Sequence, residues 1–220
     1  MKTHLTRFSA VELLITLLAL ITLAPFVDAF RFGDFIVTGL LVLILIAAVL
    51  CAGASRWRLV VASILAVLLI IARIVTLIRP DHSTWVVTYV AALAFCGFVI
   101  IQLLRFVMTA PRVTVDVLCA AIATYILMAL TWSAAYLLES QAKLDAFAFS
   151  NVHRPVQGLQ SFEAFYFSLI TLTTVGFGDI TPVSPVARML AATEAMMGVL
   201  YMAILVAHLV SLYRREDRER

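Results

Sequence analysis

The sequence predicts an all-α membrane protein with six transmembrane helices and a short re-entrant helix between the fifth and the sixth. Of its 220 residues, 64% are hydrophobic and 13% are charged, whereas soluble domains hold about 45–50% apolar and about 25% charged residues. The mean hydropathy is +1.07. A soluble chain of this length cannot bury so much apolar surface, which excludes a soluble enzyme, a disordered chain and a secreted disulfide scaffold. A net charge of +3 does not indicate nucleic acid, so we expect membrane lipid as the surrounding partner.

Six apolar runs are each long enough to cross the bilayer core, which takes about 20 helical residues. Their approximate bounds are Phe8–Val27, Asp34–Ala52, Trp57–Ile78, Trp85–Met108, Val113–Leu138 and Val186–Tyr213. Short polar breaks separate the first five runs. Pro80 and Pro111 lie in two of these breaks, where helices are expected to end. Cys51, Cys96 and Cys119 lie inside apolar runs and are interpreted as buried hydrophobic residues.

The first run has an alternative interpretation. Lys2 and Arg7 precede it and Val27-Asp28-Ala29 follows it, an arrangement that is also typical of a secretory signal peptide. Cleavage there would leave five spans and the same orientation for the rest. The run is long for a signal core, which favours an uncleaved span.

The basic residues predict the orientation of the chain. They gather at alternate breaks between the runs, namely at Lys2, Arg7, Arg56, Arg58, Arg105, Arg112, Arg214, Arg215, Arg218 and Arg220. By the positive-inside rule these breaks are cytoplasmic. We therefore expect a multi-pass protein of the cell (cytoplasmic) membrane, with both termini in the cytoplasm and the long connection Glu139–Pro185 outside.

That long connection is not uniformly polar. A polar stretch, Glu139–Gln160, precedes an apolar piece, Phe162–Leu172, which is too short to span a membrane. Ser161 is expected to cap a helix that runs through Thr173. A short apolar helix followed by a glycine-containing turn indicates a re-entrant loop, which is stable at membrane depth only inside protein or against water.

The turn after this helix reads Thr174-Val175-Gly176-Phe177-Gly178-Asp179. Glycine at alternate positions permits backbone angles that other residues avoid, so successive carbonyls can point to one side. A row of carbonyl oxygens replaces the hydration shell of a cation. The negative end of the helix dipole also favours a cation there.

The hexapeptide resembles the signature filter of potassium channels, and residues Val113–Tyr213 are similar to the pore of the tetrameric cation channel superfamily. The resemblance implies a pore helix, a selectivity filter formed by Thr174, Val175, Gly176, Phe177 and Gly178, and passive K⁺ conduction. The K⁺ ligands would be the carbonyls of the first four and the Thr174 hydroxyl. Because one chain supplies one filter strand and the ring needs four, the resemblance implies a homotetramer. No cofactor is expected besides K⁺ as the permeant ion.

The resemblance also assigns roles around the filter, with departures from the family pattern. Asp179 would lie at the outer mouth, Arg188 would be the basic residue that follows, and Gly198 would be a gating hinge.

Phe177 and Phe167 replace the two partners of a hydrogen bond that the family usually has. The Tyr166 hydroxyl is the expected partner of Asp179 at the outer mouth. Ile170 occupies the position where some bacterial channels have a glutamate.

The division into domains follows from the same comparison. Residues 1–112 are expected to form a four-span sensor-like membrane domain, and residues 113–220 the pore domain. The fourth span carries only Arg105, and Arg73 is solitary in the third, so there is no arginine ladder. We expect a channel that is not strongly voltage-gated. No soluble regulatory ligand is predicted.

Other charges in the spans have two interpretations each. Glu12 and Asp116 lie near the predicted cytoplasmic face and are expected to pair with nearby arginines. Glu194 lies deeper and is expected to bond behind the pore helix, to its threonines, or to set a proton-sensitive gate. Arg73 is expected to reach the outer interface, Asp34 or Asp81.

Competing functions remain. Gly176-Phe177-Gly178-Asp179 also matches the Gly-x-Gly-Asp motif of intramembrane aspartyl proteases, which need a second aspartate. Asp116 is the candidate, but the predicted topology places it at the opposite membrane face. A transporter subunit is disfavoured because the chain has one loop with two filter glycines. A less selective or non-conducting channel is the further alternative.

Overall fold

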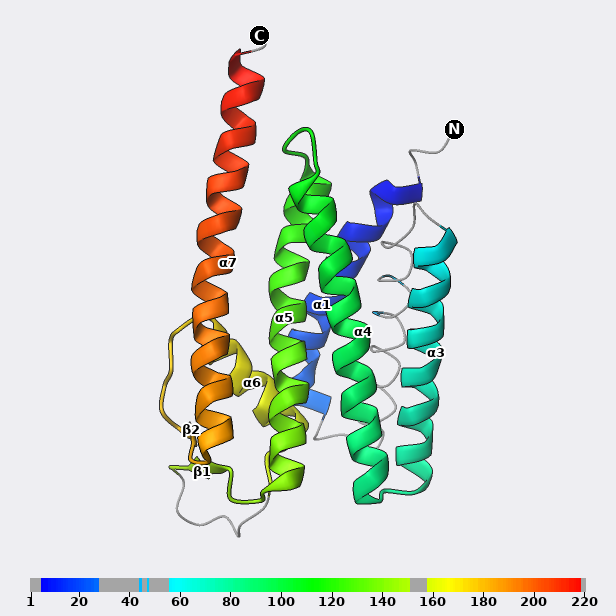
Figure 1. Ribbon diagram of the computed structural model, residues 1–220, viewed down its shortest axis with the longest axis vertical. Coiled ribbons are helices and arrows are strands. Elements are labelled where there is room, and N and C mark those ends of the chain that lie inside the picture. The colour runs from blue at the N-terminus through cyan, green and yellow to red at the C-terminus, as the bar shows by residue number, and fades with distance from the viewer. Residues whose placement is uncertain (1–4, 28–43, 45–46, 48–55, 151–157, 219–220) are drawn as a thin grey trace.

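The computed structural model describes residues 5–27, 44, 47, 56–150 and 158–218. They form six helices and two short strands (Figure 1). The helices are α1 (Leu5–Val27), α3 (Arg56–Ile78), α4 (His82–Met108), α5 (Val115–Ala142), α6 (Ser161–Leu172) and α7 (Pro185–Arg218). The strands are β1 (Phe147–Phe149) and β2 (Ile180–Pro182). The predicted second span, Asp34–Ala52, lies outside the described residues except for Ile44 and Ala47.

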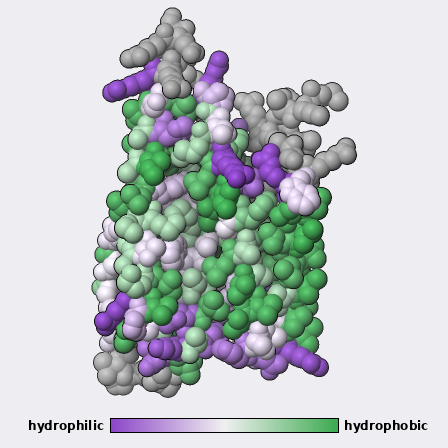
Figure 2. Space-filling view, viewed as in Figure 1, coloured by the Kyte–Doolittle hydropathy of each residue, from purple (hydrophilic) through white to green (hydrophobic). Residues whose placement is uncertain are grey.

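Four of the described helices are long and apolar enough to cross a membrane, over residues Trp57–Ile78, His82–Met108, Val115–Ala142 and Pro185–Arg214. Figure 2 shows the corresponding apolar band between two polar ends. In α1 the described side chains contain a shorter apolar stretch, Ala10–Leu23. The chain is therefore an all-α, multi-pass membrane protein.

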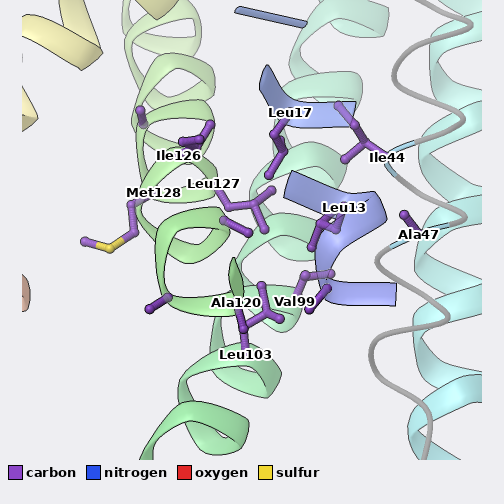
Figure 3. Packing of buried hydrophobic residues seen from close by; sticks show 14 of the residues in the cluster. Leu13, Leu17, Ile44, Ala47, Val99, Leu103, Ala120, Ile126, Leu127 and Met128 are labelled. Carbon is purple, nitrogen blue, oxygen red and sulfur yellow. The ribbon is translucent and has the colours of Figure 1, made fainter. Parts of the chain in front are cut away.

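Helix α5 is the centre of the packing. Helix α4 lies along it, α1, α6 and α7 contact it, and α3 packs on α4. Leu13 and Leu17 of α1 meet Val99 of α4 and Leu127 of α5 in a shared core (Figure 3). Small buried residues on α5, such as Ala120, permit close approach of neighbouring helices.

The helix ends reproduce the grouping of basic residues that the sequence predicts. Helices α1, α3 and α5 begin, and α4 and α7 end, at the same end of the bundle (Figure 1). Arg58, Arg105, Arg112 and Arg214 belong to these helix ends and the connections beside them. Strands β1 and β2 lie at the opposite end.

The starts of α6 and α7 are fixed by side chains. The prediction that Ser161 caps α6 is wrong, because the cap residue is Gln160, whose backbone N–H donates to Glu163 Oε2 at 3.0 Å. Gln160 has extended backbone and Glu163 is three residues on, the spacing of a capping box. For α7, Ser184 Oγ accepts from the Ala187 N–H at 3.0 Å and donates to Glu139 Oε1 at 2.7 Å.

Candidate functional site

The candidate site is the segment between α6 and β2. Helix α6 starts near the strand end of the bundle, passes obliquely beside α5 and α7, and stops partway along (Figure 1). The following segment returns to the strand end. There β2 pairs antiparallel with β1, with Phe149 opposite Ile180. The Ser150 N–H donates to the Asp179 carbonyl at 3.0 Å. The chain thus runs inward along α6 and turns back to the end from which it started.

The backbone of this segment takes left-handed angles at every second residue. The φ values are +59° at Thr174, +53° at Gly176 and +79° at Gly178. Such an alternation lets neighbouring carbonyls share one side, as the glycine spacing predicts. Thr174 has a Cβ, so its left-handed φ carries strain of order 1–3 kcal/mol, of a kind that clusters at functional sites.

The segment is held to α6 by its first amides. The N–H groups of Val175 and Gly176 both donate to the Ile170 carbonyl, at 2.9 and 3.1 Å. Beyond them, the side chains of Val175 and Phe177 are 55% and 71% exposed in the single chain. The segment therefore has a fixed start on the helix and an open face along its length.

The expected partner of Asp179 is present. Tyr166 Oη donates to Asp179 Oδ2 at 2.9 Å, and the Tyr166 ring stacks on Phe162 with centroids 6.5 Å apart. The other carboxylate oxygen, Oδ1, is buried and accepts no hydrogen bond from the described residues. Arg188 Nε donates to the Pro182 carbonyl at 3.3 Å, beside the same turn.

Phe167 lies in an aromatic cluster behind the segment. Its ring centroid is 4.9 Å from that of Tyr136 and 5.5 Å from that of Phe147. Apolar packing thus occupies the position where the family usually has a hydrogen-bond donor. Phe177 is exposed within the single chain, in contrast to Phe167.

Gly198 of α7 lies against the end of α6. A Cβ added there would lie 2.1 Å from the Leu172 carbonyl oxygen, which also accepts from Tyr125 Oη at 3.0 Å. Helix α7 continues through this position without a break. The observed requirement for glycine is therefore close helix approach, and the hinge role stays a prediction.

Glu194 bonds behind α6 as expected, but the expectation of threonine partners is wrong. Its side chain is fully buried, and its two oxygens form hydrogen bonds with Tyr136 of α5 and Ser168 of α6. Sequence reasoning missed both partners, because Tyr136 is 58 residues and Ser168 is 26 residues away in the chain. The available signal was the rule that a buried carboxyl needs polar neighbours.

Two further charged residues that the sequence singles out, Arg73 and Asp116, belong to α3 and α5. Arg73 packs over the Trp85 ring, with its guanidinium carbon 5.8 Å from the centroid. Asp116 lies in the first turn of α5, roughly 35 Å by helix rise from Glu139. Because Ser184, close after β2, bonds Glu139, Asp116 and Asp179 occupy opposite ends of the bundle. This separation leaves a Gly-x-Gly-Asp protease dyad without support.

The known proteins that resemble this chain are ion channels. Residues 113–215 match the family model described as "Ion channel". The chain is 44% identical over 59 residues to "Potassium voltage-gated channel protein shk-1" of Caenorhabditis elegans, covering 25% of this chain and 11% of that protein. It is 38% identical over 58 residues to "Probable potassium channel protein 2" of Methanocaldococcus jannaschii, covering 25% and 17%. It is 34% identical over 53 residues to "Inward rectifier potassium channel Kirbac3.1" of Paramagnetospirillum magnetotacticum, covering 24% and 18%.

The fold is that of a multi-pass membrane protein, and the relatives it resembles are potassium channels rather than enzymes. Residues 113–215 carry the match to the ion channel model, and the relatives with similar sequence are potassium channels. The chain spans less than a fifth of the length of these three relatives. No solved structure matches the chain.

Proposed function

We propose that four copies of this chain form a potassium-selective channel that conducts K⁺ passively across the cell membrane. The observation that carries the proposal is the left-handed backbone at Thr174, Gly176 and Gly178, in a re-entrant segment with the sequence Thr-Val-Gly-Phe-Gly-Asp. The ion ligands are the carbonyls of residues 174–177 and the Thr174 hydroxyl. In this proposal, α6 is the pore helix and residues 174–178 are the selectivity filter.

A tetramer accounts for the open face of the filter. One strand of carbonyls cannot surround an ion, whereas four strands around a shared axis can replace its hydration shell. The exposed apolar side chains on α7, including Met196, Val199 and Ile204, are then divided between neighbouring copies, the conduction path and lipid.

The orientation follows from the arrangement of charge. The bundle end that carries Arg58, Arg105, Arg112 and Arg214 faces the cytoplasm, together with both termini. The filter then opens toward the outside, with Asp179 and Tyr166 at the outer mouth and Gly198 at a hinge of the pore-lining helix. Residues 113–220 form the pore domain, and residues 1–112 form a sensor-like domain without an arginine ladder, so voltage moves little charge.

The experiment that tests conduction is K⁺ flux into liposomes that contain the purified protein. Wild type is expected to take up K⁺, and Gly176→Ala is expected to abolish uptake. A left-handed φ costs an L-residue about 1–2 kcal/mol, or about 4–8 kcal/mol over four copies. Gly97→Ala is the matched control, since its added Cβ in α4 meets nothing within 4 Å. Flux in Gly176→Ala equal to that of wild type would contradict the filter assignment.

A further inference from the structure

A buried carboxyl lies where three helices of the pore domain meet. Glu194 of α7 has no exposed surface, and it contacts Tyr136 of α5 and Ser168 of α6 through hydrogen bonds to separate carboxyl oxygens. The Tyr136 ring packs against Phe167, so the surroundings are otherwise apolar. A carboxyl in such a place persists only where its oxygens are hydrogen-bonded.

Counting protons fixes the state of this group. The Ser168 hydroxyl has one proton, yet its oxygen lies within hydrogen-bond distance of two others, the Ala129 carbonyl at 2.7 Å and Glu194 Oε1. Both contacts have the geometry of a Ser168 O–H donor. A backbone carbonyl can only accept, and one proton makes one linear hydrogen bond, so we assign the Ser168 proton to Ala129. The contact with Oε1 then needs a proton from Glu194, while Tyr136 donates to Oε2.

The ionised form does not satisfy the same contacts. With a carboxylate at Glu194, the two protons of Ser168 and Tyr136 would have to serve three contacts. One pair of oxygens would then face each other without a proton between them. The arrangement is balanced when Glu194 carries a proton, because a carboxylic acid both donates and accepts.

The cluster lies directly behind the start of the filter. Ser168 is one helical turn before Leu172, whose carbonyl is held by Tyr125 and touched by α7 at Gly198. The N–H groups of Val175 and Gly176 donate to the carbonyl of Ile170, which lies between Ser168 and Leu172 in α6. A change in how α6 sits between α5 and α7 therefore moves the carbonyls that follow.

We propose that Glu194, as a neutral carboxylic acid, is a positioning residue for the filter: it donates to Ser168, accepts from Tyr136 and so fixes α6 between α5 and α7. Its effect on K⁺ flux rests on the proposed function. Its protonation rests on the contacts alone, and the two are tested separately.

Infrared spectroscopy tests the protonation without any flux. We expect the difference spectrum of wild type minus Glu194→Gln, in lipid at neutral pH, to contain the C=O stretching band of a protonated carboxylic acid. Carboxylate bands in its place would overturn the proposal. If the wild-type protein shows the carboxylic acid band but no K⁺ flux, the proposed function is refuted, whereas the protonation of Glu194 is supported.

Flux measurements test the positioning role. Glu194→Gln keeps every contact, since its amide donates to Ser168 and accepts from Tyr136, and should retain K⁺ flux within about twofold of wild type. Glu194→Met has a similar size without these bonds, and should lower flux per tetramer by about tenfold or more. The control Thr193→Val removes a hydroxyl that, within the described residues, donates to the Met189 carbonyl of its own helix, and should leave flux unchanged.

A double variant distinguishes loss of the Glu194–Ser168 contact from a general loss of stability. Ser168→Ala should reduce flux as Glu194→Met does, and combining the two should add little, because coupled residues are not additive. Each variant is compared at equal amounts of tetramer, measured by size-exclusion chromatography. Glu194→Gln as impaired as Glu194→Met, or Glu194→Met with normal flux, would overturn the proposal.

Discussion

Replacing Tyr166 by phenylalanine removes the hydroxyl that bonds Asp179, at the outer end of the proposed filter. That hydroxyl donates to Asp179 Oδ2 at 2.9 Å, and Asp179 Oδ1 accepts no hydrogen bond from the described part of the chain. The carboxylate therefore depends strongly on this bond. The phenylalanine keeps the ring that stacks on Phe162, so apolar packing is preserved.

The magnitude follows from the kind of bond. A hydrogen bond to a charged group contributes about 1.5–3 kcal/mol, which corresponds to a change in rate of about tenfold to a hundredfold. We expect the K⁺ current of Tyr166→Phe to decay faster by that factor during sustained opening. The amount of folded tetramer should change little, because Tyr166 is only half-buried at the protein surface.

The assay is the time course of current in planar bilayers with symmetric K⁺. Tyr213→Phe is the control, since Tyr213 is 67% exposed at the far end of α7. A decay rate in Tyr166→Phe that equals those of wild type and the control would show that this hydrogen bond does not hold the proposed outer mouth.

Three further predictions concern helix packing, capping and voltage. Gly198→Ala should destabilise the protein by about 1–3 kcal/mol through overpacking, read from its denaturation midpoint beside Gly97→Ala, and an unchanged midpoint would contradict the close approach. Ser184→Ala should cost about 0.5–2 kcal/mol by removing the α7 cap, whereas Ser184→Thr, which keeps the hydroxyl, should cost less; equal losses would argue against the cap. Open probability should depend on voltage with about one gating charge or fewer per subunit. A steeper slope that is lost on Arg73→Gln or Arg105→Gln would show that the first four spans are a voltage sensor.

Local patterns predicted the parts of the site that depend on local sequence. The short helix and the left-handed angles at Gly176 and Gly178 follow from the half-length apolar run and from the glycine spacing, both within a single stretch of chain. The left-handed angle at Thr174 was not predicted. Tyr166 and Asp179 are 13 residues apart in the segment between α5 and α7, so their hydrogen bond could also be predicted from the sequence.

Contacts between distant segments were not predictable in the same way. The spacing of apolar residues in α5 does not single out Tyr136, among the residues of that helix, as the partner of Glu194, which lies 58 residues later. Strand β1 has only three residues, Phe147–Phe149, too few for an alternating pattern to stand out in a polar stretch. The close approach at Gly198 also depends on how α6 and α7 cross.

Helix bounds differed for a physical reason. The run ending at Leu138 marks the apolar part of α5, but the helix continues to Ala142 through Glu139, Ser140 and Gln141. Hydropathy reports where the membrane ends, whereas backbone hydrogen bonds continue into the polar region. Helix α7 likewise extends past Tyr213 to Arg218.

Selection of K⁺ by residues 174–178 can be measured as the reversal potential of the purified protein in a planar bilayer. With K⁺ on one side and Na⁺ on the other, we expect a reversal potential that follows the K⁺ gradient. A reversal potential near zero in that asymmetry, with measurable current, would contradict this selection.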